Sequence, residues 1–393
     1  MSEKRSKTAL RNMNLVIMES AATAALLATP IMTPFYIGLG LSQEEIALSQ
    51  MAFTVVVVVL NMPLGWVADR FSRKWANVFG DLLVALALFL YSMANSFWYI
   101  VFCEVLCGVG SALSQGVDST LLKHFAAKVD DSGHLFRKKF AKMASWKQIS
   151  MLFILLLGGP IGAISFRLAI ALSAVPMVIG AFIGLLIEDD SEKLEATSRN
   201  PIKEVDGLLR RNIGNSKFRT SVAAYAVGRE ITHGIIWCFT PLLLYVGVPL
   251  AVVSAGWTIN YIAAYFGTRL ARRFARRMRD WQIFVVPIGL VTLASMAMFI
   301  QLTPFTIGLY LLFGLAQGWS SATLMPMVKE HVRASEQSSM ESFAHVVAEI
   351  LYIGAVWAIN RAADIELRYA LLATVLIFVP LAIPIGFRLR KKN

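Results

Sequence analysis

The amino-acid sequence predicts an all-α membrane protein that crosses the bilayer twelve times. Hydrophobic residues make up 57% of the 393 residues and charged residues only 16%, whereas soluble domains average about 45–50% and about 25%. A membrane-spanning helix needs about 20 mostly apolar residues. Twelve such helices with short connections use the whole chain, so we expect no separate soluble catalytic domain.

Twelve apolar runs of sufficient length follow one another along the chain. The first run follows four basic residues, as in a signal peptide, but it contains Glu19 and lacks a small-residue cleavage site, so we expect it to be retained as a span. The expected spans are residues 13–37, 44–68, 76–95, 97–122, 143–163, 165–187, 219–246, 249–270, 281–301, 304–328, 337–360 and 367–388.

The positions of lysine and arginine orient these spans. If the N-terminus is cytoplasmic, 33 of the 37 lysines and arginines fall on the cytoplasmic side, as the positive-inside rule requires. The net charge of +12 is then explained by topology and by the anionic lipids of the inner leaflet, and nucleic-acid binding is not expected. We expect a monomer in a bacterial cytoplasmic (inner) membrane, with both termini in the cytoplasm.

The longest polar stretch divides the chain into two halves of six spans each. We expect an N-terminal six-helix bundle at residues 1–187, a cytoplasmic linker at 188–218 and a C-terminal six-helix bundle at 219–393. Within the linker, Asn200-Pro201 followed by apolar residues at helical spacing predicts a short amphipathic helix on the membrane surface.

Three landmarks recur in the same order in the two halves, which predicts an internal repeat. Repeated halves are how alternating-access transporters place a substrate site at the interface of the repeats. The matched landmarks are Thr33-Pro34 before Gly38 and Thr240-Pro241 before Gly247, Gly108 and Gly314 each fifteen residues before a lysine, and Gly65 and Gly267 near the ends of the second and eighth spans.

The loop after the second span carries the most specific motif, Gly65-Trp66-Val67-Ala68-Asp69-Arg70-Phe71-Ser72-Arg73-Lys74. It resembles the signature between helices two and three of the major facilitator superfamily. Together with the twelve spans and the repeat, the resemblance covers the whole chain. It implies two pseudo-repeated six-helix bundles and a secondary transporter that works by alternating access without a cofactor. We expect no enzymatic activity, because the sequence has no phosphate-binding glycine loop, nucleophile elbow or metal motif.

The same resemblance implies a conformational latch at the inner face. In this family the loop acid and arginine pair with an acid at the cytoplasmic end of helix four and with the start of helix eleven, here Ser338 and Glu341, when the inner side is closed. The loop glycine allows close helix approach. The expected latch residues are Gly65, Asp69, Arg70, Arg73 and Asp118.

Two weaker resemblances concern spans four and five. Glu104 stands where a family segment usually begins with an arginine that is tied to proton transfer, so that mechanism cannot be assumed. Gly158-Gly159-Pro160-Ile161-Gly162 is similar to a truncated form of the glycine- and proline-rich signature of drug:proton antiporters. A role in helix packing and bending explains it equally well.

Ionisable side chains inside the apolar runs are the main functional candidates, because a charge at the bilayer centre costs about 2.5–3.5 kcal/mol. Arg229, Glu230 and His233 fall near the middle of span seven at spacings that share one helix face, and His345 and Glu349 do so in span eleven. A static polar network is the alternative reading of both clusters. The candidates for proton coupling or the substrate cavity are Glu19, Glu104, Arg229, Glu230, His233, Trp237, Gln317, Trp319, His345 and Glu349. We expect Asp81 to neutralise bases near the inner face.

Proton-coupled export of a lipophilic or cationic small molecule is the function that these features favour, with the proton as coupling ion. Three alternatives stay open: proton-coupled uptake of a small polar metabolite, translocation of a lipid or lysolipid, and transport of a transition metal. For the last, His233, Glu230, His345 and Glu349 offer suitable ligands, but no spacing requires a metal. Cys103, Cys107 and Cys238 lie in apolar runs without ligand spacing, so we expect neither a disulfide framework nor a resident metal site.

The latch predicts the effect of Asp69→Asn. Loss of the carboxylate removes one partner of the ion pairs that hold the inner side closed, so inward-open molecules should become more abundant and transport should change. Labelling of single cysteines at the two membrane faces measures this population. Unchanged labelling together with unchanged transport would show that Asp69 is not part of a latch.

Overall fold

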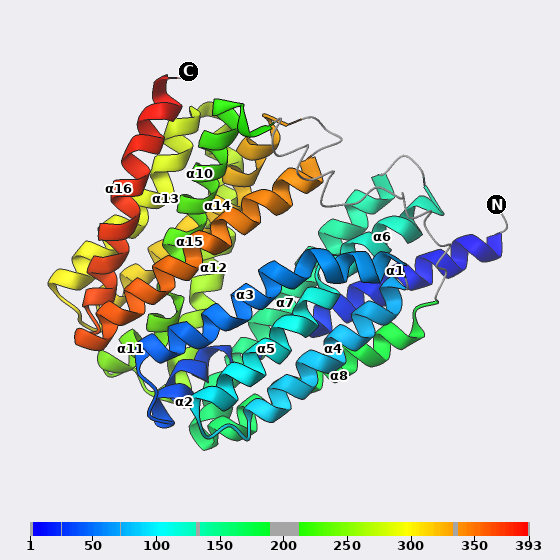
Figure 1. Cartoon of the computed structure of the whole chain (residues 1–393), viewed down its shortest axis with the longest axis horizontal. Helices are drawn as coiled ribbons and strands as arrows, with labels where there is room; N and C mark the ends of the chain where they lie inside the picture. Colours follow the sequence, from blue (N-terminus) through cyan, green and yellow to red (C-terminus); the bar gives the residue numbers. More distant parts are fainter. Residues whose placement is uncertain are drawn as a thin grey trace. The chain divides into compact units, whose positions relative to one another are not determined.

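Every regular element that the structure describes is a helix (Figure 1). The computed structural model describes residues 3–24, 26–70, 72–130, 134–188, 212–332 and 337–391. The predicted linker helix after Asn200-Pro201 lies outside these residues. Each of the twelve predicted spans corresponds to one helix or to two consecutive helices, so the predicted all-α membrane fold is confirmed.

The helices of the first six spans follow the predicted order. α7 begins well before its predicted start at residue 143, because a basic segment continues the helix beyond the apolar run. The elements are α1 (Glu3–Thr23), η1 (Thr29–Ile31), α2 (Met32–Gly38), α3 (Gln43–Arg70), α4 (Arg73–Tyr91), α5 (Phe97–Ser114), α6 (Val117–Ala127), α7 (His134–Ile164) and α8 (Phe166–Leu186).

The last six spans repeat this pattern. The elements are α10 (Ser216–His233), α11 (Ile236–Tyr245), α12 (Leu250–Phe274), η2 (Ala275–Arg277), α13 (Asp280–Ile300), η3 (Thr306–Tyr310), α14 (Leu311–Lys329), α15 (Gln337–Ile365) and α16 (Tyr369–Lys391). Among the residues described, nine helices are long and apolar enough to cross a membrane. The first, seventh and tenth spans account for the other three, and the first and seventh are each broken into two helices.

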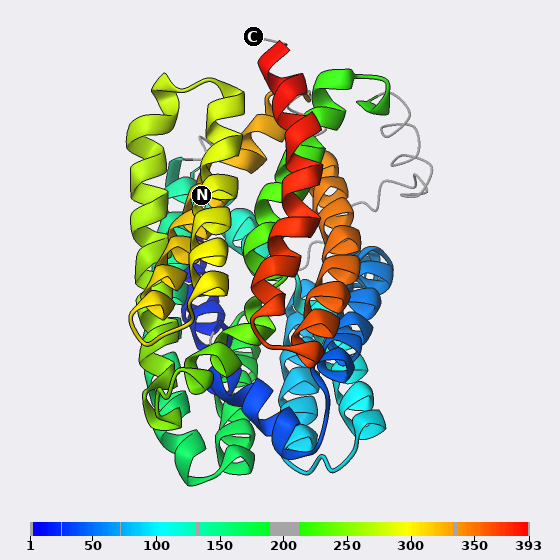
Figure 2. The same ribbon diagram turned by 90° about the vertical axis from the view of Figure 1, so that its left-hand side faces the viewer.

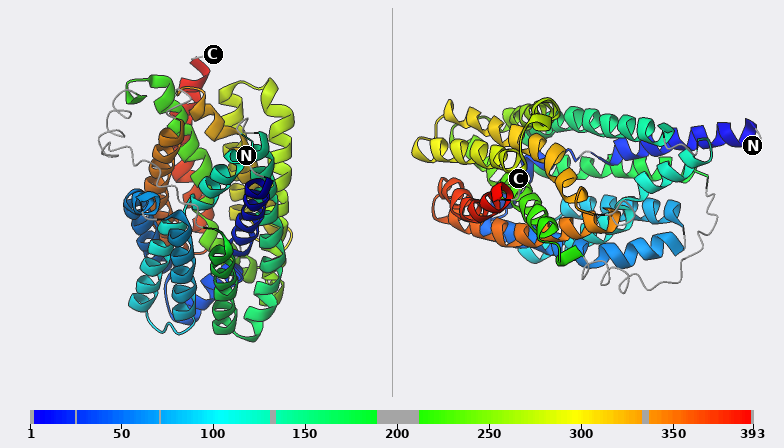
Figure 3. Two further views of the ribbon diagram at one scale, coloured as in Figure 1. Left: turned by 90° about the vertical axis from the view of Figure 1, so that its right-hand side faces the viewer. Right: turned by 90° about the horizontal axis from the view of Figure 1, so that it is seen from above.

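The chain forms two compact units. The first unit comprises Met1–Leu39, Ser49–Thr197 and Leu250–Ala255, and the second comprises Gly40–Leu48, Ser198–Pro249 and Gly256–Asn393. In the first unit α1, drawn in dark blue, packs against α7 and α8 (Figure 3). In the second unit α16, drawn in red, lies beside α13, drawn in yellow (Figure 2). The division into bundles at 1–187 and 219–393 stays a prediction.

The proline landmark lies in the second helix of each of the two broken spans. Pro34 lies in α2 and Pro241 in α11. The glycine that matches Gly247 is Gly40 rather than the predicted Gly38, because each follows its proline by six residues and adopts a left-handed backbone, with φ of 85° at Gly40 and 87° at Gly247. Only glycine adopts this conformation without strain, so both halves use the same turn after the broken span.

The second landmark is a matched pair of close helix contacts. A Cβ atom on Gly108 of α5 would lie 3.2 Å from the carbonyl oxygen of Phe53 in α3, and one on Gly314 of α14 would lie 2.3 Å from that of Asn260 in α12. The fourth span therefore approaches the second, and the tenth approaches the eighth, through glycine in both cases. This equivalence supports the internal repeat.

The third landmark, Gly65 and Gly267, differs between the two halves in its contacts. Gly267 of α12 lies against the α14 backbone, since its Cβ would be 2.1 Å from the carbonyl oxygen of Leu315, whereas a Cβ on Gly65 of α3 would meet no described atom within 4 Å. Since several of the side chains around this loop lie outside the described residues, a close helix approach at Gly65 stays a prediction.

The glycine-rich end of span five serves helix packing. A Cβ on Gly158 of α7 would lie 2.2 Å from the carbonyl oxygen of Leu27, and one on Gly162 would lie 2.7 Å from Cγ2 of Ile31. Both glycines thus let α7 lie against the broken segment between α1 and α2. The packing interpretation of this motif accounts for the glycines without reference to antiport.

The contact between α12 and α14 predicts that Gly318→Ala is destabilising. The added Cβ would lie 1.8 Å from the carbonyl oxygen of Ala264, so the two backbones must separate. We expect a loss of about 1–3 kcal/mol, the usual cost of overpacking, seen as a lower midpoint of thermal unfolding in detergent. Gly289→Ala is the matched control, because its Cβ would meet no described atom within 4 Å. Equal midpoints for the two variants would contradict this account.

Candidate functional site

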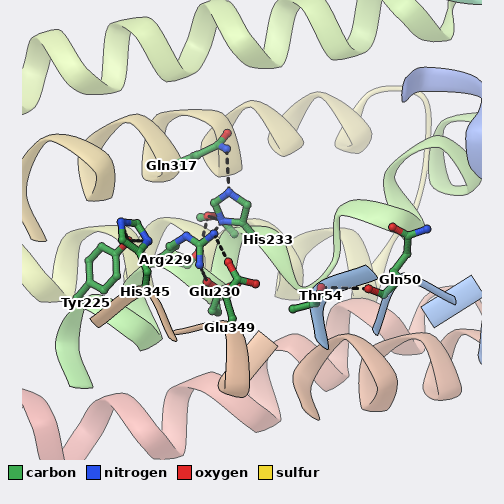
Figure 4. A network of polar contacts seen from close by, with 10 residues as sticks. Gln50, Thr54, Tyr225, Arg229, Glu230, His233, Gln317, His345 and Glu349 are labelled. Carbon is green, nitrogen blue, oxygen red and sulfur yellow. Dashed lines mark hydrogen bonds and ion pairs between the residues drawn. The ribbon is translucent and has the colours of Figure 1, made fainter. Parts of the chain in front are cut away.

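A buried ion-pair cluster joins α10 to α15 in the second unit (Figure 4). Nη1 of Arg229 lies 2.5 Å from Oε1 of Glu230, and Nη2 lies 2.9 Å from Oε1 of Glu349. We call these three residues the Arg229 triad. The structure thereby unites the two clusters that the sequence placed on separate spans.

The triad holds more negative than positive charge when both carboxyl groups are ionised. The Glu230 side chain is 0% exposed, while those of Arg229 and Glu349 are each 26% exposed. Oε2 of Glu230 is buried and has no hydrogen-bond partner among the described residues. Because an excess charge in a buried site is costly, the triad favours the gain of one proton or one cation.

His233 connects the triad to α14. Its Nδ1 lies 2.8 Å from the carbonyl oxygen of Arg229, and its Nε2 lies 3.3 Å from Nε2 of Gln317. A carbonyl oxygen can only accept, so Nδ1 carries the hydrogen, and Nε2 of the neutral ring accepts from the Gln317 amide. These two hydrogen bonds orient the Gln317 side chain and hold the backbone of Arg229.

His345 precedes Glu349 by one helical turn in α15. It pairs with Tyr225, which was not among the predicted site residues. The hydroxyl of Tyr225 lies 2.9 Å from Nδ1 of His345. Tyr225 precedes Arg229 by four residues, so the i, i+4 spacing that linked Arg229 to His233 also pointed to it. Trp237 has a similar partner, because its Nε1 donates to the hydroxyl of Tyr352 at 2.9 Å.

An aromatic pocket lies next to Gln317 within the second unit. The rings of Phe239 and Tyr310 stack with centroids 3.8 Å apart, and those of Tyr310 and Phe313 stack at 4.5 Å. Oδ1 of Asn260 is buried without a hydrogen-bond partner among the described residues. The lining residues are Thr232, Ile236, Phe239, Trp257, Asn260, Tyr261, Tyr310, Phe313 and Gln317. Gln317 therefore belongs both to the pocket and to the network around the triad.

Trp319 does not contribute a free polar group to this region. Its side chain is 6% exposed, and its Nε1 donates to the carbonyl oxygen of Ile283 in α13 at 3.0 Å. The indole therefore packs α14 against α13. Its predicted contact with substrate has no support in this position.

Glu104 lies in the first unit, in a polar network of its own. It accepts from Nε2 of Gln50 and from the hydroxyl of Tyr36, the latter at 3.4 Å, and this hydroxyl also lies 3.2 Å from that of Tyr91. The carboxyl is 6% exposed. Glu104 and Glu19 make no contact with each other among the described contacts.

The predicted latch residues are described only in part. Asp118 binds Nζ of Lys147 at 2.6 Å, and Glu341 binds Nζ of Lys329 at 2.7 Å. Arg73 begins α4. The side chains of Asp69, Arg70 and Ser338 lie outside the described residues, so the latch stays a prediction.

No metal-binding cluster is found in the described ranges, where no three His, Cys, Asp or Glu side chains converge. Within the site, Arg229 occupies the space between the two carboxyl groups of the triad. A cationic side chain at the centre of the acids is an unfavourable neighbour for a divalent ion. The ligand set considered for transition-metal transport is therefore not assembled here.

The triad predicts a stability coupling between Arg229 and Glu230. Arg229→Met leaves the carboxyl groups without a counter-charge, and removal of one partner from a buried pair costs about 3–5 kcal/mol, here an upper bound because Arg229 is partly exposed. The double variant Arg229→Met/Glu230→Gln should recover part of this loss. Thermal unfolding in detergent measures both.

Arg368→Met is the control for this experiment. Arg368 pairs with Glu366, but the two side chains are 38% and 33% exposed, and exposed pairs contribute about 0–1 kcal/mol. If Arg229→Met were as stable as Arg368→Met, the proposed excess of negative charge in the triad would be contradicted. The same holds if Arg229→Met/Glu230→Gln regained no stability.

Comparisons with known proteins agree with the fold. The sequence profile of the Major Facilitator Superfamily matches residues 15–355. Protein spinster of Drosophila melanogaster is 23% identical over 278 residues, which are 66% of this chain and 42% of that protein, so the match spans less than half of this curated relative.

Solved structures cover nearly the entire chain. A bacterial homolog of the human lysosomal transporter Spinster, in an inward-facing and unoccupied conformation, has a TM-score of 0.77 at 14% identity over 99% of this chain and 98% of its own. The nucleoside transporter NupG has a TM-score of 0.77 at 14% identity over 98% of both chains. At these identities they show a common fold. From the profile match over residues 15–355, the chain belongs to the major facilitator superfamily of membrane transporters.

Proposed function

We propose that this protein exports a lipophilic cation in exchange for protons. The observation that carries the proposal is the charge of the Arg229 triad, in which two carboxyl groups share one guanidinium. One proton or one monovalent cation neutralises the excess charge, and the two cannot do so together. Competition for a single buried charge is the basis of exchange, because each ligand leaves when the other binds.

The aromatic pocket is narrow in this structure, and it binds the lipophilic part of such a substrate only after its stacked rings separate. Stacked rings bind apolar and aromatic groups, and their faces attract cations. Gln317 lines the pocket and contacts His233, whose Nδ1 binds the carbonyl oxygen of Arg229. A substrate in the pocket and a proton on the triad are thereby linked through two side chains.

Proton-coupled uptake of a small polar metabolite is the second candidate. The amides of Asn260 and Gln317 line the same pocket, and Oδ1 of Asn260 is free to accept a hydrogen bond from a ring substituent. Among the proteins of similar fold are a nucleoside transporter and a D-xylose-proton symporter.

The proposal of export also includes the type and location of the protein. We propose that it is a monomer of the drug:proton antiporter type. It lies in a bacterial inner membrane with both termini in the cytoplasm.

Transport in proteoliposomes tests the proposal. With the membrane potential clamped by potassium and valinomycin, vesicles with an acidic interior should accumulate tetraphenylphosphonium in exchange for outgoing protons. Glu230→Gln and Glu349→Gln should each reduce this accumulation to the level of protein-free vesicles, since the amide removes the charge for which proton and cation compete. Glu366→Gln, at an exposed pair, should leave it unchanged.

Uridine and lysophosphatidylcholine serve as comparison substrates in the same vesicles. With the pH gradient reversed so that protons flow inward, accumulation of uridine, without movement of tetraphenylphosphonium under either gradient, would replace export by metabolite uptake. Movement of lysophosphatidylcholine alone would favour lipid translocation. Either result would contradict the exchange of a cation for protons.

A further inference from the structure

Two buried carboxyl groups lie beside each other inside the first unit. Glu19 of α1 is 2% exposed and Asp81 of α4 is 4% exposed. The polar side chains that face the Glu19 carboxyl are those of Asp81 and Asn77. Asp81 was expected to neutralise bases near the inner face, but in the described part of the chain it forms no ion pair and instead lies beside Glu19.

The lysine that acts on this pair, Lys147, already binds another carboxyl group. Asp118 of α6 and Lys147 of α7 are the other charged groups that act on the pair, and they bind each other at 2.6 Å. Ser20 also donates to Asp118, at 2.6 Å. Of the described residues, three carboxyl groups therefore share one lysine in this region, and Asp118 takes most of its charge.

The helix α8 packs over the pair at a glycine. A Cβ on Gly180 of α8 would lie 3.4 Å from Oδ2 of Asp81 and 3.7 Å from the carbonyl oxygen of Glu19. The α8 backbone thus lies directly against the pair at a residue without a side chain. In α5, Glu104 is bound to Gln50 and Tyr36 and is not among the groups that face Glu19 or Asp81.

Three atoms of this cluster are buried and lack a hydrogen-bond partner among the described residues. They are Oε2 of Glu19, Oδ2 of Asp81 and Nδ2 of Asn77. Buried polar atoms in native proteins are almost always bonded, and two adjacent carboxylates in an apolar bundle repel each other strongly. One proton between the two oxygen atoms would satisfy both, and the Asn77 amide is free to donate to the charge that remains.

We propose that Glu19 and Asp81 form a proton-binding site in which the two carboxyl groups share one proton between Oε2 of Glu19 and Oδ2 of Asp81. The proton is taken up from water and returned to water, and no other bond changes. Asp118, whose side chain is 16% exposed, and Lys147, at 38%, are the nearby charged groups that solvent reaches. Proton entry occurs on their side of the pair.

This site is independent of the Arg229 triad and of the proposed export. It lies wholly in the first unit and binds its proton without substrate. A sodium ion is the competing occupant, since carboxylate and amide oxygens are ligands for hard cations. The unpartnered amide nitrogen of Asn77, which faces Glu19, favours a proton, because nitrogen-bound hydrogens repel a metal ion.

Infrared difference spectra of the full chain in lipid, recorded between acidic and alkaline pH in potassium chloride, test this proposal. The wild-type protein should show a protonated-carboxyl band that shifts in deuterium oxide. Because the proton is shared, Glu19→Gln and Asp81→Asn, each combined with Glu230→Gln so that the triad takes up no proton, should each abolish the whole band that the pair contributes, although each removes only one carboxyl group. Glu366→Gln and Glu230→Gln should both retain it, the latter even if export fails.

Three outcomes would overturn the proposal. Partial losses that add up from the two substitutions would show two separate acids, and an unchanged band in both would show that neither binds the proton. Loss of the wild-type band when sodium chloride replaces potassium chloride would assign the site to sodium. If an amide variant does not fold, the swapped variant Glu19→Asp/Asp81→Glu keeps both carboxyl groups, and a folded swapped protein without the band would equally refute the shared proton.

Discussion

The pairing of one arginine with two glutamates organises the polar interior of the second unit. A charged group is costly in the middle of a helix bundle, so each member of the Arg229 triad depends on the other two. The pairing holds α10 against α15, and His233 extends it to α14 through Gln317. Tyr225 and His345 add a second link between α10 and α15. Gln317, which belongs to this network, is also one of the polar residues that line the aromatic pocket.

Apolar run length was sufficient to locate the membrane helices, because it depends only on the thickness of the bilayer. It could not show that the first and seventh spans are broken, since the residues at the breaks are as apolar as their neighbours. The basic extension of α7 was missed for the opposite reason, as its charges end an apolar run without ending a helix. The internal repeat was visible in glycine and proline spacing, but the structure was needed to match Gly40 with Gly247.

The functional residues were predictable only within a single helix. Depth and an i, i+4 spacing identified Arg229, Glu230 and His233 together, whereas the partnership of Arg229 with Glu349 spans 120 positions in the chain and depends on tertiary packing. The same limit explains Asp81, whose neighbours along the helix gave no indication of Glu19. For Trp319, residue type suggested a ligand contact, but it gave no indication that the indole nitrogen donates to the carbonyl oxygen of Ile283.

The close glycine contacts between helices have a consequence for the evolution of the sequence. Gly80 and Gly110 each lie against the other's carbonyl oxygen, and Gly267 and Gly318 bring α12 and α14 together in the same manner. The nearest contacts at these glycines are with backbone atoms, which every residue type supplies. Residues that line the interior can therefore be exchanged without loosening the helices, and the scaffold can drift from one cargo to another while its architecture persists.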